Sequence, residues 1–408
     1  MGEFPKVELP SENAPTELVT VEEGKAKLRL TGPVFYNPVQ EFNRDLTVLV
    51  LREFVRSRAT STNVQCALSE PKTKKVKYVA ENEDNSIRVL DALSASGLRA
   101  LRFAKEVNNV GFVLANDFSE KAVQSIRDNI LLNDVGERVI PNFGDAVETM
   151  MSHRYTNKRF HAVDLDPYGS ASVFLDSAVQ CVADNDMAVL CGNTPETCYN
   201  KYGSTTVRLK CCHELALRIL LRSIDSHANR YTRYIEPLLS ISIDFYVRVF
   251  VRIHSGARIT KESACKVGNV FACSGCHSME ISPILKKTMN EISVKYCTSV
   301  VRQTLMGADN KCSHCGHSVH QAGPIYIAPI HNRLFVDAIL SRSSEKRQKK
   351  SDLAHHNRLM GVLTNVFEVK AYVVYLYFYI YYIFTYLFLF APYTDIFIWI
   401  NGAEKTHH

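Results

Sequence analysis

The sequence lacks the features that define several common classes of protein. No secretory signal peptide precedes its 12 cysteines, so the cysteines do not indicate a disulfide scaffold. The net charge of +6 is small for 408 residues, which permits a nucleic-acid partner without indicating one. With 46% hydrophobic and 22% charged residues, the composition is globular and not disordered. We therefore expect two or three domains in a reducing, intracellular compartment.

Two well-known motifs are present only in incomplete form. A turn of small residues over 92–97 follows the apolar run 87–91, but it lacks the full G-x-G-x-x-G pattern, so a dinucleotide is not expected. His213-Glu214 lies in a predicted helix over 205–230, but the second histidine of a zinc hydrolase motif is missing four positions on. We assign this dipeptide a structural or substrate-positioning role.

Apolar runs alternate with helical patterns from residue 87 onward, which predicts a doubly wound α/β sheet of the Rossmann-like type. The predicted strands cover 87–91, 111–115, 139–143 and 160–163. Each strand ends at or just before an acidic side chain: Asp91, Asp117, Asp145 or Asp164. The carboxyl ends of parallel strands lie at one edge of a sheet, where such folds bind their ligands.

S-adenosylmethionine fits a pocket built from these strand ends. Asp117 lies about 20 positions after the small-residue turn, where an acidic side chain binds ribose hydroxyls. Asp145 is placed to accept from the adenine amine, and the turn 92–97 to approach the methionine part. The alternative for Asp117 is an N-cap role, shared with Ser119, at the start of the next helix.

The stretch 164–170, Asp-Leu-Asp-Pro-Tyr-Gly-Ser, follows the fourth strand and suits a planar base with an exocyclic amine. The Asp166 carboxylate and the Pro167 carbonyl can accept from the amine, and the Tyr168 ring can stack on the base. These three residues are the predicted catalytic set. The alternative is an ordinary β-turn, because Asp and Pro are common turn residues.

Two C-x-x-C pairs predict a structural zinc site in a smaller domain that follows the sheet. Cys273 and Cys276 form the first pair, and Cys312 and Cys315 form the second. Four thiolates complete a tetrahedral zinc and leave no open position for catalysis. Unpaired buried thiols are the alternative.

Taken together, these motifs resemble the family of tRNA (guanine-26-N2)-dimethyltransferases over about residues 33 to 345. The stretches that carry the resemblance are Phe35-Tyr36-Asn37-Pro38, Asn43-Arg44-Asp45, Asp91-Ala92-Leu93-Ser94-Ala95-Ser96-Gly97-Leu98-Arg99, Asn116-Asp117, Gly144-Asp145-Ala146, Asp164-Leu165-Asp166-Pro167-Tyr168-Gly169, Asn193-Thr194-Pro195-Glu196-Thr197-Cys198-Tyr199, Cys212-His213-Glu214 and Asp244-Phe245-Tyr246-Val247-Arg248. The resemblance implies methyl transfer from S-adenosylmethionine to the exocyclic N2 of a guanine in tRNA. It further implies a cofactor site formed by Arg44, Arg99, Asp117, Asp145 and Ala146. It implies that Asp166 to Tyr168 hold the target guanine.

The expected division of the chain is a flexible leader over 1–32, a methyltransferase domain over 33–256, a zinc-knuckle domain over 257–345, and a basic linker with a hydrophobic tail over 346–408. After Asp184 the chain is about eight to ten residues shorter than the family pattern, roughly one strand. We expect residues 187–191 to supply a replacement strand. We expect the family resemblance to stop at about Leu363.

The uncharged stretch 371–394 exceeds the ~20 residues that span a bilayer, but its many tyrosines make it a poor span. We expect tRNA and S-adenosylmethionine as partners, a monomer, and no membrane association unless this tail is a true anchor. The basic run 346–350 is most often a solvated linker, and nuclear targeting or contact with RNA phosphates are the alternatives. We expect a nuclear location, with cytoplasm and mitochondria as further alternatives.

Two other functions remain open at this stage. Asp-Pro-Tyr suits any exocyclic amine, so an adenine amino-methyltransferase acting on DNA is one alternative. A non-catalytic, zinc-containing RNA-binding protein is the other.

Overall fold

The computed structural model describes residues 19–30, 36–67, 86–167, 169–188, 195–243, 246–289, 293–300, 304–307, 309–345 and 352–368. The chain divides into two compact units, residues 1–360 and 361–408. Every element discussed below lies in the first unit, except that the last helix, α10 (His356–Glu368), crosses the division.

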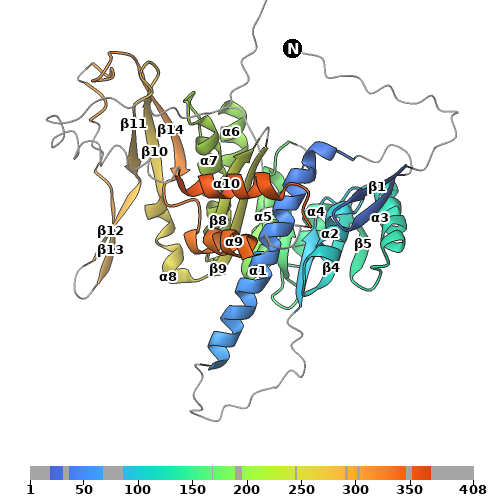
Figure 1. Cartoon of the computed structure of the whole chain (residues 1–408). Coiled ribbons are helices and arrows are strands. Elements are labelled where there is room, and N and C mark those ends of the chain that lie inside the picture. The colour runs from blue at the N-terminus through green and yellow to red at the C-terminus, as the bar shows by residue number, and fades with distance from the viewer. Residues whose placement is uncertain are drawn as a thin grey trace, which may run out of the picture. The chain divides into compact units, whose positions relative to one another are not determined.

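The first unit is built on a seven-stranded sheet with the order β5-β4-β3-β6-β7-β9-β8 among the described residues (Figure 1). Neighbouring strands from β5 to β7 are parallel, and β9 is antiparallel to both β7 and β8. The strands are β3 (Ile87–Asp91), β4 (Val110–Asp117), β5 (Val139–Phe143), β6 (Phe160–Asp164), β7 (Val182–Ala188), β8 (Arg233–Ile243) and β9 (Tyr246–Ser255). The order reverses between β3 and β6, which makes their carboxyl ends the switch point where such sheets bind ligands.

Helices cover both faces of this sheet, as the predicted doubly wound fold requires. On one face, α1 (Glu41–Ala67) packs on α2 (Leu98–Glu106), and α3 (Glu120–Asn133) covers β4 and β5. On the other, α5 (Leu175–Cys181) packs between α4 (Ala146–Ser152) and α7 (Cys212–Asn229). Short 3-10 turns, η1 (Pro38–Gln40) and η2 (Ser172–Phe174), precede α1 and α5.

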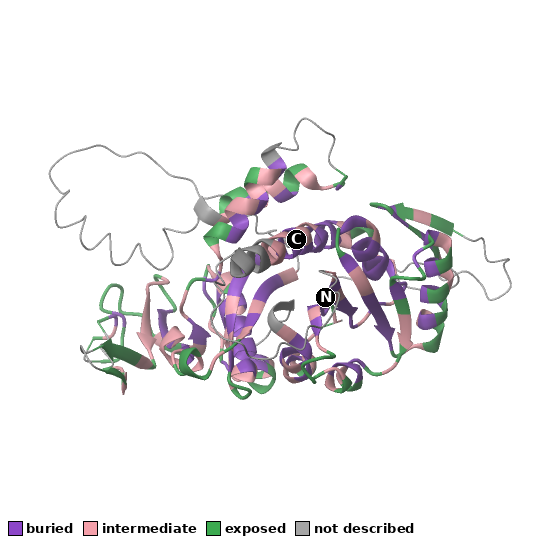
Figure 2. Cartoon of the chain, turned by 90° about the horizontal axis from the view of Figure 1, so that it is seen from below, coloured by how far each residue is buried: buried purple, intermediate pink, exposed green. Residues whose placement is uncertain are grey.

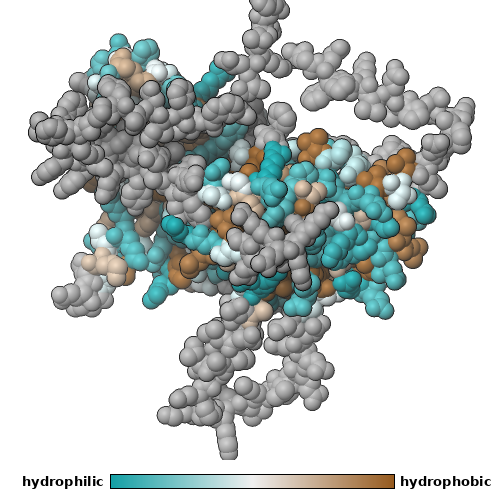
Figure 3. Space-filling model, viewed as in Figure 1, coloured by the Kyte–Doolittle hydropathy of each residue, from teal (hydrophilic) through white to brown (hydrophobic). Residues whose placement is uncertain are grey.

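The central strands are apolar because helices bury them from both sides. Ile87, Val89 and Leu90 of β3 are each at most 1% exposed. Because the neighbouring side chains of Val89 and Leu90 point to opposite faces of the sheet, both faces are covered here. Figure 2 shows this sheet as a mostly buried core. The coloured part of the face in Figure 3 is mostly hydrophilic, with hydrophobic residues in small groups.

The predicted gap in the sheet after Asp184 is closed by a strand that begins earlier than expected. Strand β7 starts at Val182, directly after α5, and not at residue 187. Its pairing with β6 shifts between Phe160 and Ala162, which accommodates the abrupt connection. The buried Arg233 of β8 donates to the carbonyls of Val179 and Ala183 on either side of this junction. The sheet is therefore continuous. The sequence pattern over 172–183 favours a helix, but α5 covers only Leu175–Cys181.

The prediction of a flexible leader over 1–32 is wrong for residues 19–30. These residues form a hairpin of β1 (Val19–Glu23) and β2 (Ala26–Leu30), whose Glu23, Ala26 and Leu28 are at most 2% exposed. The polar composition of residues 1–32 favours a mobile segment, but Ala26, Leu28 and Leu30 alternate with polar residues, as in a strand with one buried face. The buried Glu23 is neutralised by arginines from α1 and α2.

Three other boundaries differ from the sequence expectations. The polar composition of residues 58–86 favours an exposed loop, but α1 continues through the first of these residues to Ala67. Helix α7 begins at Cys212, and residues 205–211 of the predicted helix are not helical. The β pattern over 239–253 belongs to two strands, β8 and β9, which pair as an antiparallel hairpin.

The region after the large sheet carries smaller sheets. Strands β11 (Met279–Pro283), β10 (Val267–Cys273) and β14 (Val319–Tyr326) form one, and β12 (Leu285–Met289) pairs with β13 (Val294–Thr298). The remaining elements are α8 (Ala257–Thr260), η3 (Ser263–Lys266) and α9 (Arg333–Glu345), which packs on α1 and β8. Among the described residues, no helix is both long and apolar enough to cross a membrane. The uncharged stretch 371–394 and the basic run 346–350 lie outside those residues.

Candidate active site

The switch point brings two acidic strand ends side by side. Asp91 of β3 and Asp164 of β6 are paired in register, and both are at most 4% exposed. The Ala92 N–H donates to the Asp164 carbonyl at 3.1 Å, so the turn that follows β3 is hydrogen-bonded to the end of β6. Sequence reasoning placed both residues at strand ends, but only the strand order makes them neighbours.

Two arginines from distant parts of the chain hold the predicted catalytic carboxylate. Arg99 of α2 donates to Asp164 at 2.9 Å and also to Asp166. Arg248 of β9 places Nη2 at 3.7 Å from Asp164 Oδ1 and at 3.9 Å from Asp166 Oδ1. Both arginines are at most 8% exposed, whereas the Asp166 side chain is 38% exposed. Asp166 is therefore fixed from the inside and open to solvent on its outer side.

In this cluster the pKa values of Asp91 and Asp166 are shifted in opposite directions. Burial and the nearby Asp164 charge raise the pKa of Asp91 to about 7. Burial alone would raise the pKa of Asp166, but Arg99 and Arg248 outweigh it, so the pKa of Asp166 is lowered. At neutral pH, Asp166 is an ionised hydrogen-bond acceptor.

The small-residue turn connects β3 to the start of α2 and places backbone donors near Asp117. Gly97 has a φ of +83°, a left-handed conformation that glycine adopts without strain, and its carbonyl begins α2. The Asp117 carboxylate accepts from the Ala95 and Ser119 N–H groups, each at 2.9 Å. Ser119, and not Asp117, caps α3. Each Asp117 oxygen thus has one backbone donor and can accept a further hydrogen bond.

Asp145 is the N-cap of helix α4. Its Oδ1 accepts from the Val147 and Glu148 N–H groups at 2.8 and 3.0 Å, at the start of α4. The Asp145 side chain is exposed, and Ala146 beside it is buried. No interaction of Oδ2 with the described residues is present, so this oxygen can accept from a ligand.

Asn116 is a site residue that sequence reasoning missed. It is fully buried, and its side-chain amide donates to the carbonyls of Ala92 and Gly144 at 3.0 and 3.1 Å. It therefore ties together the turns that follow β3 and β5. The available signal was a second polar residue beside Asp117 at the end of a strand that is apolar up to that point.

The structure does not bring Arg44 into the carboxylate cluster through any direct contact among the described residues. Arg44 pairs with Glu23 through two hydrogen bonds, one of 2.6 Å from Nε, and donates to the Asn37 carbonyl at 3.0 Å. Its guanidinium also lies 5.5 Å from the Tyr36 ring centre. Glu23 was missed because it belongs to the segment interpreted as a leader.

Tyr168 lies outside the described residues, and Pro167 is half-buried beside it. The chain after this motif is anchored by α6 (Pro195–Tyr202), because the Tyr202 hydroxyl and Ser170 Oγ are 3.1 Å apart. His213 lies within hydrogen-bond distance of Ser242, at 3.2 Å, and Glu214 pairs with Arg218 at 2.8 Å. These contacts agree with a structural role for the His-Glu dipeptide, and its substrate-positioning role stays a prediction.

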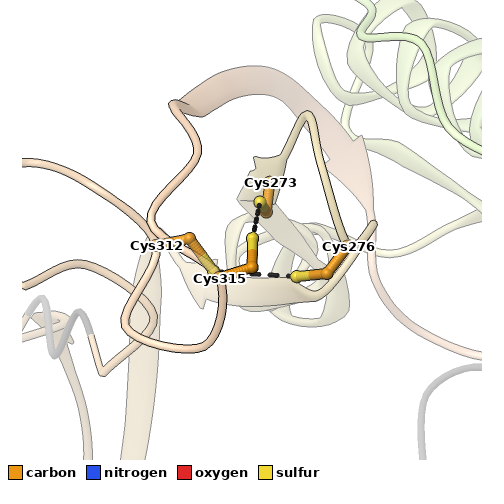
Figure 4. Close-up of side chains that lie close together, drawn as sticks. All are labelled: Cys273, Cys276, Cys312 and Cys315. Atoms are coloured by element: carbon orange, nitrogen blue, oxygen red, sulfur yellow. Dashed lines mark hydrogen bonds between the residues drawn. The ribbon is translucent and has the colours of Figure 1, made fainter.

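The four predicted metal ligands converge from two turns (Figure 4). The sulfurs of Cys273, Cys276, Cys312 and Cys315 all lie within 4.8 Å of one another. The separations are 3.3 Å for Cys273–Cys315 and 3.7 Å for Cys276–Cys312. A tetrahedral zinc with bonds of about 2.3 Å needs sulfurs about 3.8 Å apart. The thiols thus have the spacing of a metal site.

The two cysteine turns share one backbone pattern. The Cys273 N–H donates to the Ser278 carbonyl, and the Cys312 N–H donates in the same way to the His317 carbonyl five residues on. The residue after the second cysteine of each pair has a positive φ, +59° at His277 and +74° at Gly316. Two unrelated thiol pairs would not repeat this geometry, so the turns form a matched pair of knuckles.

A parallel sheet with this strand order, a ligand-binding switch point and acidic strand ends defines a Rossmann-like α/β methyltransferase fold. The solved structure of Trm1 from Pyrococcus horikoshii with S-adenosyl-L-methionine is similar, with a TM-score of 0.63 and 26% sequence identity over 85% of this chain and 82% of that one. The sequence profile of N2,N2-dimethylguanosine tRNA methyltransferases matches residues 16–391. The chain belongs to this family.

Curated relatives agree with the family assignment. A tRNA (guanine(26)-N(2))-dimethyltransferase from Caenorhabditis elegans is 59% identical over 369 residues, which cover 88% of this chain and 70% of that protein. The human protein of the same name is 40% identical and is covered over 60% of its length, and the Drosophila melanogaster protein is covered over 66%. The family match runs past Leu363, where we expected the resemblance to end.

Proposed function

We propose that this chain transfers methyl groups from S-adenosylmethionine to the exocyclic N2 of guanine 26 in tRNA, giving N2-methyl- and N2,N2-dimethylguanine. The curated relatives carry the name of this activity. The observation that carries the proposal is the Asp166 carboxylate, held by Arg99 and Arg248 beside the switch point and open on its outer side. Neither alternative from the sequence is favoured by a specific observation.

Asp166 and Pro167 orient the acceptor amine. The N2 lone pair of guanine is delocalised into the ring, so the amine is a weak nucleophile. Hydrogen bonds from its N–H groups to the Asp166 carboxylate and the Pro167 carbonyl favour a pyramidal nitrogen that directs its lone pair at the methyl group. Because Arg99 and Arg248 lower the pKa of Asp166, the carboxylate stays an acceptor at neutral pH. Tyr168 stacks on the base, a contact worth about 1–3 kcal/mol.

The cofactor lies across the carboxyl ends of β3, β4 and β5. S-adenosylmethionine supplies an already activated methyl group on its sulfonium. Asp117 accepts from the ribose hydroxyls with the capacity that the Ala95 and Ser119 donors leave. Asp145 Oδ2 accepts from the adenine amine next to Ala146, while Oδ1 keeps its helix cap. The exposed position of Asp145 and the buried position of Asp117 suit an entering nucleoside.

Arg44 and Arg99 contribute the positive charge of the cofactor site. Arg99 sits in the first turn of α2, where backbone N–H groups also favour an anion such as the methionine carboxylate. Arg44 is held by Glu23 and the Asn37 carbonyl at the start of α1. We assign both arginines to the methionine end of the cofactor.

A structural zinc bound by Cys273, Cys276, Cys312 and Cys315 completes the region after the large sheet. The sulfur separations and the matched knuckles support this assignment. Four thiolates fill a tetrahedral zinc, so this metal stabilises the fold and takes no part in methyl transfer. We accordingly propose that the methyltransferase domain expected over 33–256 also includes the hairpin over 19–30, and that a zinc-bearing domain follows over 257–345.

The decisive experiment is Asp166→Ala in the full chain with tritiated S-adenosylmethionine and tRNA. We expect methyl incorporation to be lost while S-adenosylmethionine still binds, as isothermal titration would measure. Asp128→Ala on the outer side of α3 is the matched control and should keep full activity. Full activity of Asp166→Ala would refute the assignment.

The same assay separates the alternatives. Incorporation into duplex DNA and not into tRNA would favour the adenine methyltransferase. Failure of the wild-type chain to bind S-adenosylmethionine would favour the non-catalytic RNA-binding protein.

A further inference from the structure

Three polar side chains lie together next to the turns to which the cofactor is assigned. Asn116 is at the end of β4, Asn142 is in β5 and Thr149 is in α4. Asn116 is fully buried, Thr149 is 7% exposed and Asn142 is half-buried. We call these three residues the amide network.

The hydrogen bonds of the amide network form a closed ring. Asn142 Nδ2 donates to Asn116 Oδ1 at 2.6 Å and to Thr149 Oγ1 at 3.3 Å. The Thr149 hydroxyl donates to the same Asn116 oxygen at 3.1 Å. Asn116 Nδ2 donates to the carbonyls of Ala92 and Gly144, so its amide makes four hydrogen bonds and has no capacity left.

These hydrogen bonds determine which way the Asn116 amide points. The two ends of a side-chain amide have nearly the same shape, so the neighbouring donors and acceptors select its orientation. The donors of Asn142 and Thr149 face the Asn116 oxygen, and the NH₂ group is therefore directed at the carbonyls of Ala92 and Gly144. In the reverse orientation the amide oxygen would face two carbonyl oxygens, and the turns after β3 and β5 would be pushed apart.

The turn after β5 is in close contact with the amide network. A Cβ atom added to Gly144 would lie only 3.1, 3.3 and 3.5 Å from polar atoms of the three members. The Gly144 N–H also donates to the Asp117 carbonyl at 3.0 Å. The network therefore fixes the residue that directly precedes Asp145, and it does so from the strand that ends in Asp117.

We propose that Asn142 and Thr149 are positioning residues for the cofactor. Acting through Asn116, they set the distance between the turns after β3 and β5 before S-adenosylmethionine binds. The nucleoside then meets Asp117 and Asp145 already at the correct spacing, so its binding does not have to order the turns. This inference rests on the proposed function, because it concerns the same cofactor site, and it adds two residues that do not themselves contact the ligand.

Three variants change the hydrogen bonds of the network with little change in shape. Thr149→Val removes the hydroxyl, whereas Thr149→Ser keeps it. Asn142→Asp replaces a donor with a carboxylate oxygen that faces Asn116 Oδ1, so it favours the reverse orientation of the Asn116 amide.

The matched control is a second buried amide that joins elements away from the cofactor. Asn133 of α3 is 7% exposed, accepts from the Lys27 N–H at 2.9 Å and donates to the Lys27 carbonyl at 2.6 Å. It lies at the end of α3 that is farther from Asp117 and ties this helix to β2. Asn133→Leu therefore removes hydrogen bonds of the same kind and lowers thermal stability without reaching the turns of the site.

We expect Thr149→Val and Asn142→Asp to raise the dissociation constants of S-adenosylhomocysteine and 5′-methylthioadenosine at least about tenfold in isothermal titration. The second ligand keeps the nucleoside and lacks the amino acid. In methylation assays the KM for S-adenosylmethionine should rise by the same factor, while kcat and the KM for tRNA stay within about twofold of wild type. Thr149→Ser should restore binding, and Asn133→Leu should bind both ligands as the wild type does.

Unchanged nucleoside binding by Thr149→Val would overturn the inference. An equal loss in Asn133→Leu, or a loss in Thr149→Ser as large as that in Thr149→Val, would overturn it too, because the role would then be structural only. Thermal unfolding checks that each variant is folded, and if Asn142→Asp does not fold, the two Thr149 variants decide the outcome.

The wild-type chain separates this failure from that of the proposed function. A wild type that does not bind S-adenosylmethionine contradicts the proposed function itself. Binding by the wild type, with network variants that bind equally well, contradicts only the role of the amide network.

Discussion

The buried ion network around Arg102 predicts that one substitution far from solvent strongly destabilises the protein. The Arg102 side chain has no exposed surface, and it donates to Glu23, Asp45 and Glu106 at 2.9, 2.6 and 2.8 Å. These partners come from β1, α1 and α2, so the network joins the N-terminal hairpin to the sheet. Asp45 also accepts from the His355 N–H at 3.0 Å.

Arg102→Met removes the cation and leaves its carboxylate partners buried. Removing one partner from a buried ion pair costs about 3–5 kcal/mol, and three partners place Arg102 at the upper end of that range. Such a loss is a large share of the roughly 5–15 kcal/mol that stabilises a typical domain. Adding Asp45→Asn to Arg102→Met should recover part of the loss, because Arg102 is the arginine that pairs with Asp45 and its removal leaves that buried charge without an arginine partner.

Denaturant unfolding at pH 7, followed by circular dichroism, measures these differences. Arg138→Met is the control, since Arg138 is exposed and donates to a single carbonyl, that of Ala104. It should cost less than about 1 kcal/mol. A loss below about 1 kcal/mol for Arg102→Met, or a loss equal to that of the control, would refute the reasoning.

Two further predictions follow from the site and the cysteine cluster. The pKa of Asp91 is raised to about 7 by burial and by Asp164. Between about pH 4 and pH 7 the folded state therefore keeps a proton that the unfolded state has lost. The contribution of Asp91 to the free energy of unfolding falls as the pH rises through this window. Asp91→Asn removes this loss, and its stability relative to wild type should increase across that window by up to about 1.4 kcal/mol per pH unit; a constant difference would contradict the raised pKa. Cys312→Ser should lower the zinc content measured by mass spectrometry from one per chain to nearly none and reduce thermal stability, whereas Cys212→Ser, at an exposed thiol outside the cluster, should keep the metal; zinc retained in Cys312→Ser would contradict the four-cysteine site.

Local patterns predicted the parallel strands and their acidic ends. The predicted strand over 87–91 matches β3, which is apolar along most of its length because it is covered on both faces. The predicted strand over 139–143 matches β5, an edge strand that is only partly buried. The C-x-x-C pairs likewise predicted thiols that lie together, since each pair forms its own knuckle. The hairpin over 19–30 and the early start of β7 were not predicted. Both depend on contacts with partners far away in sequence, Arg102 for the hairpin and Arg233 for β7.

By itself, the sequence determined which chemical groups this protein has and roughly where each stands along the chain. It placed Asp91, Asp117, Asp145 and Asp164 at strand ends, because the apolar periodicity of each strand is a local property. The tertiary structure decided which of these groups meet. The strand order brings Arg248 of β9, together with Arg99, to Asp166. Such contacts join residues far apart in the chain, and no local pattern encodes them.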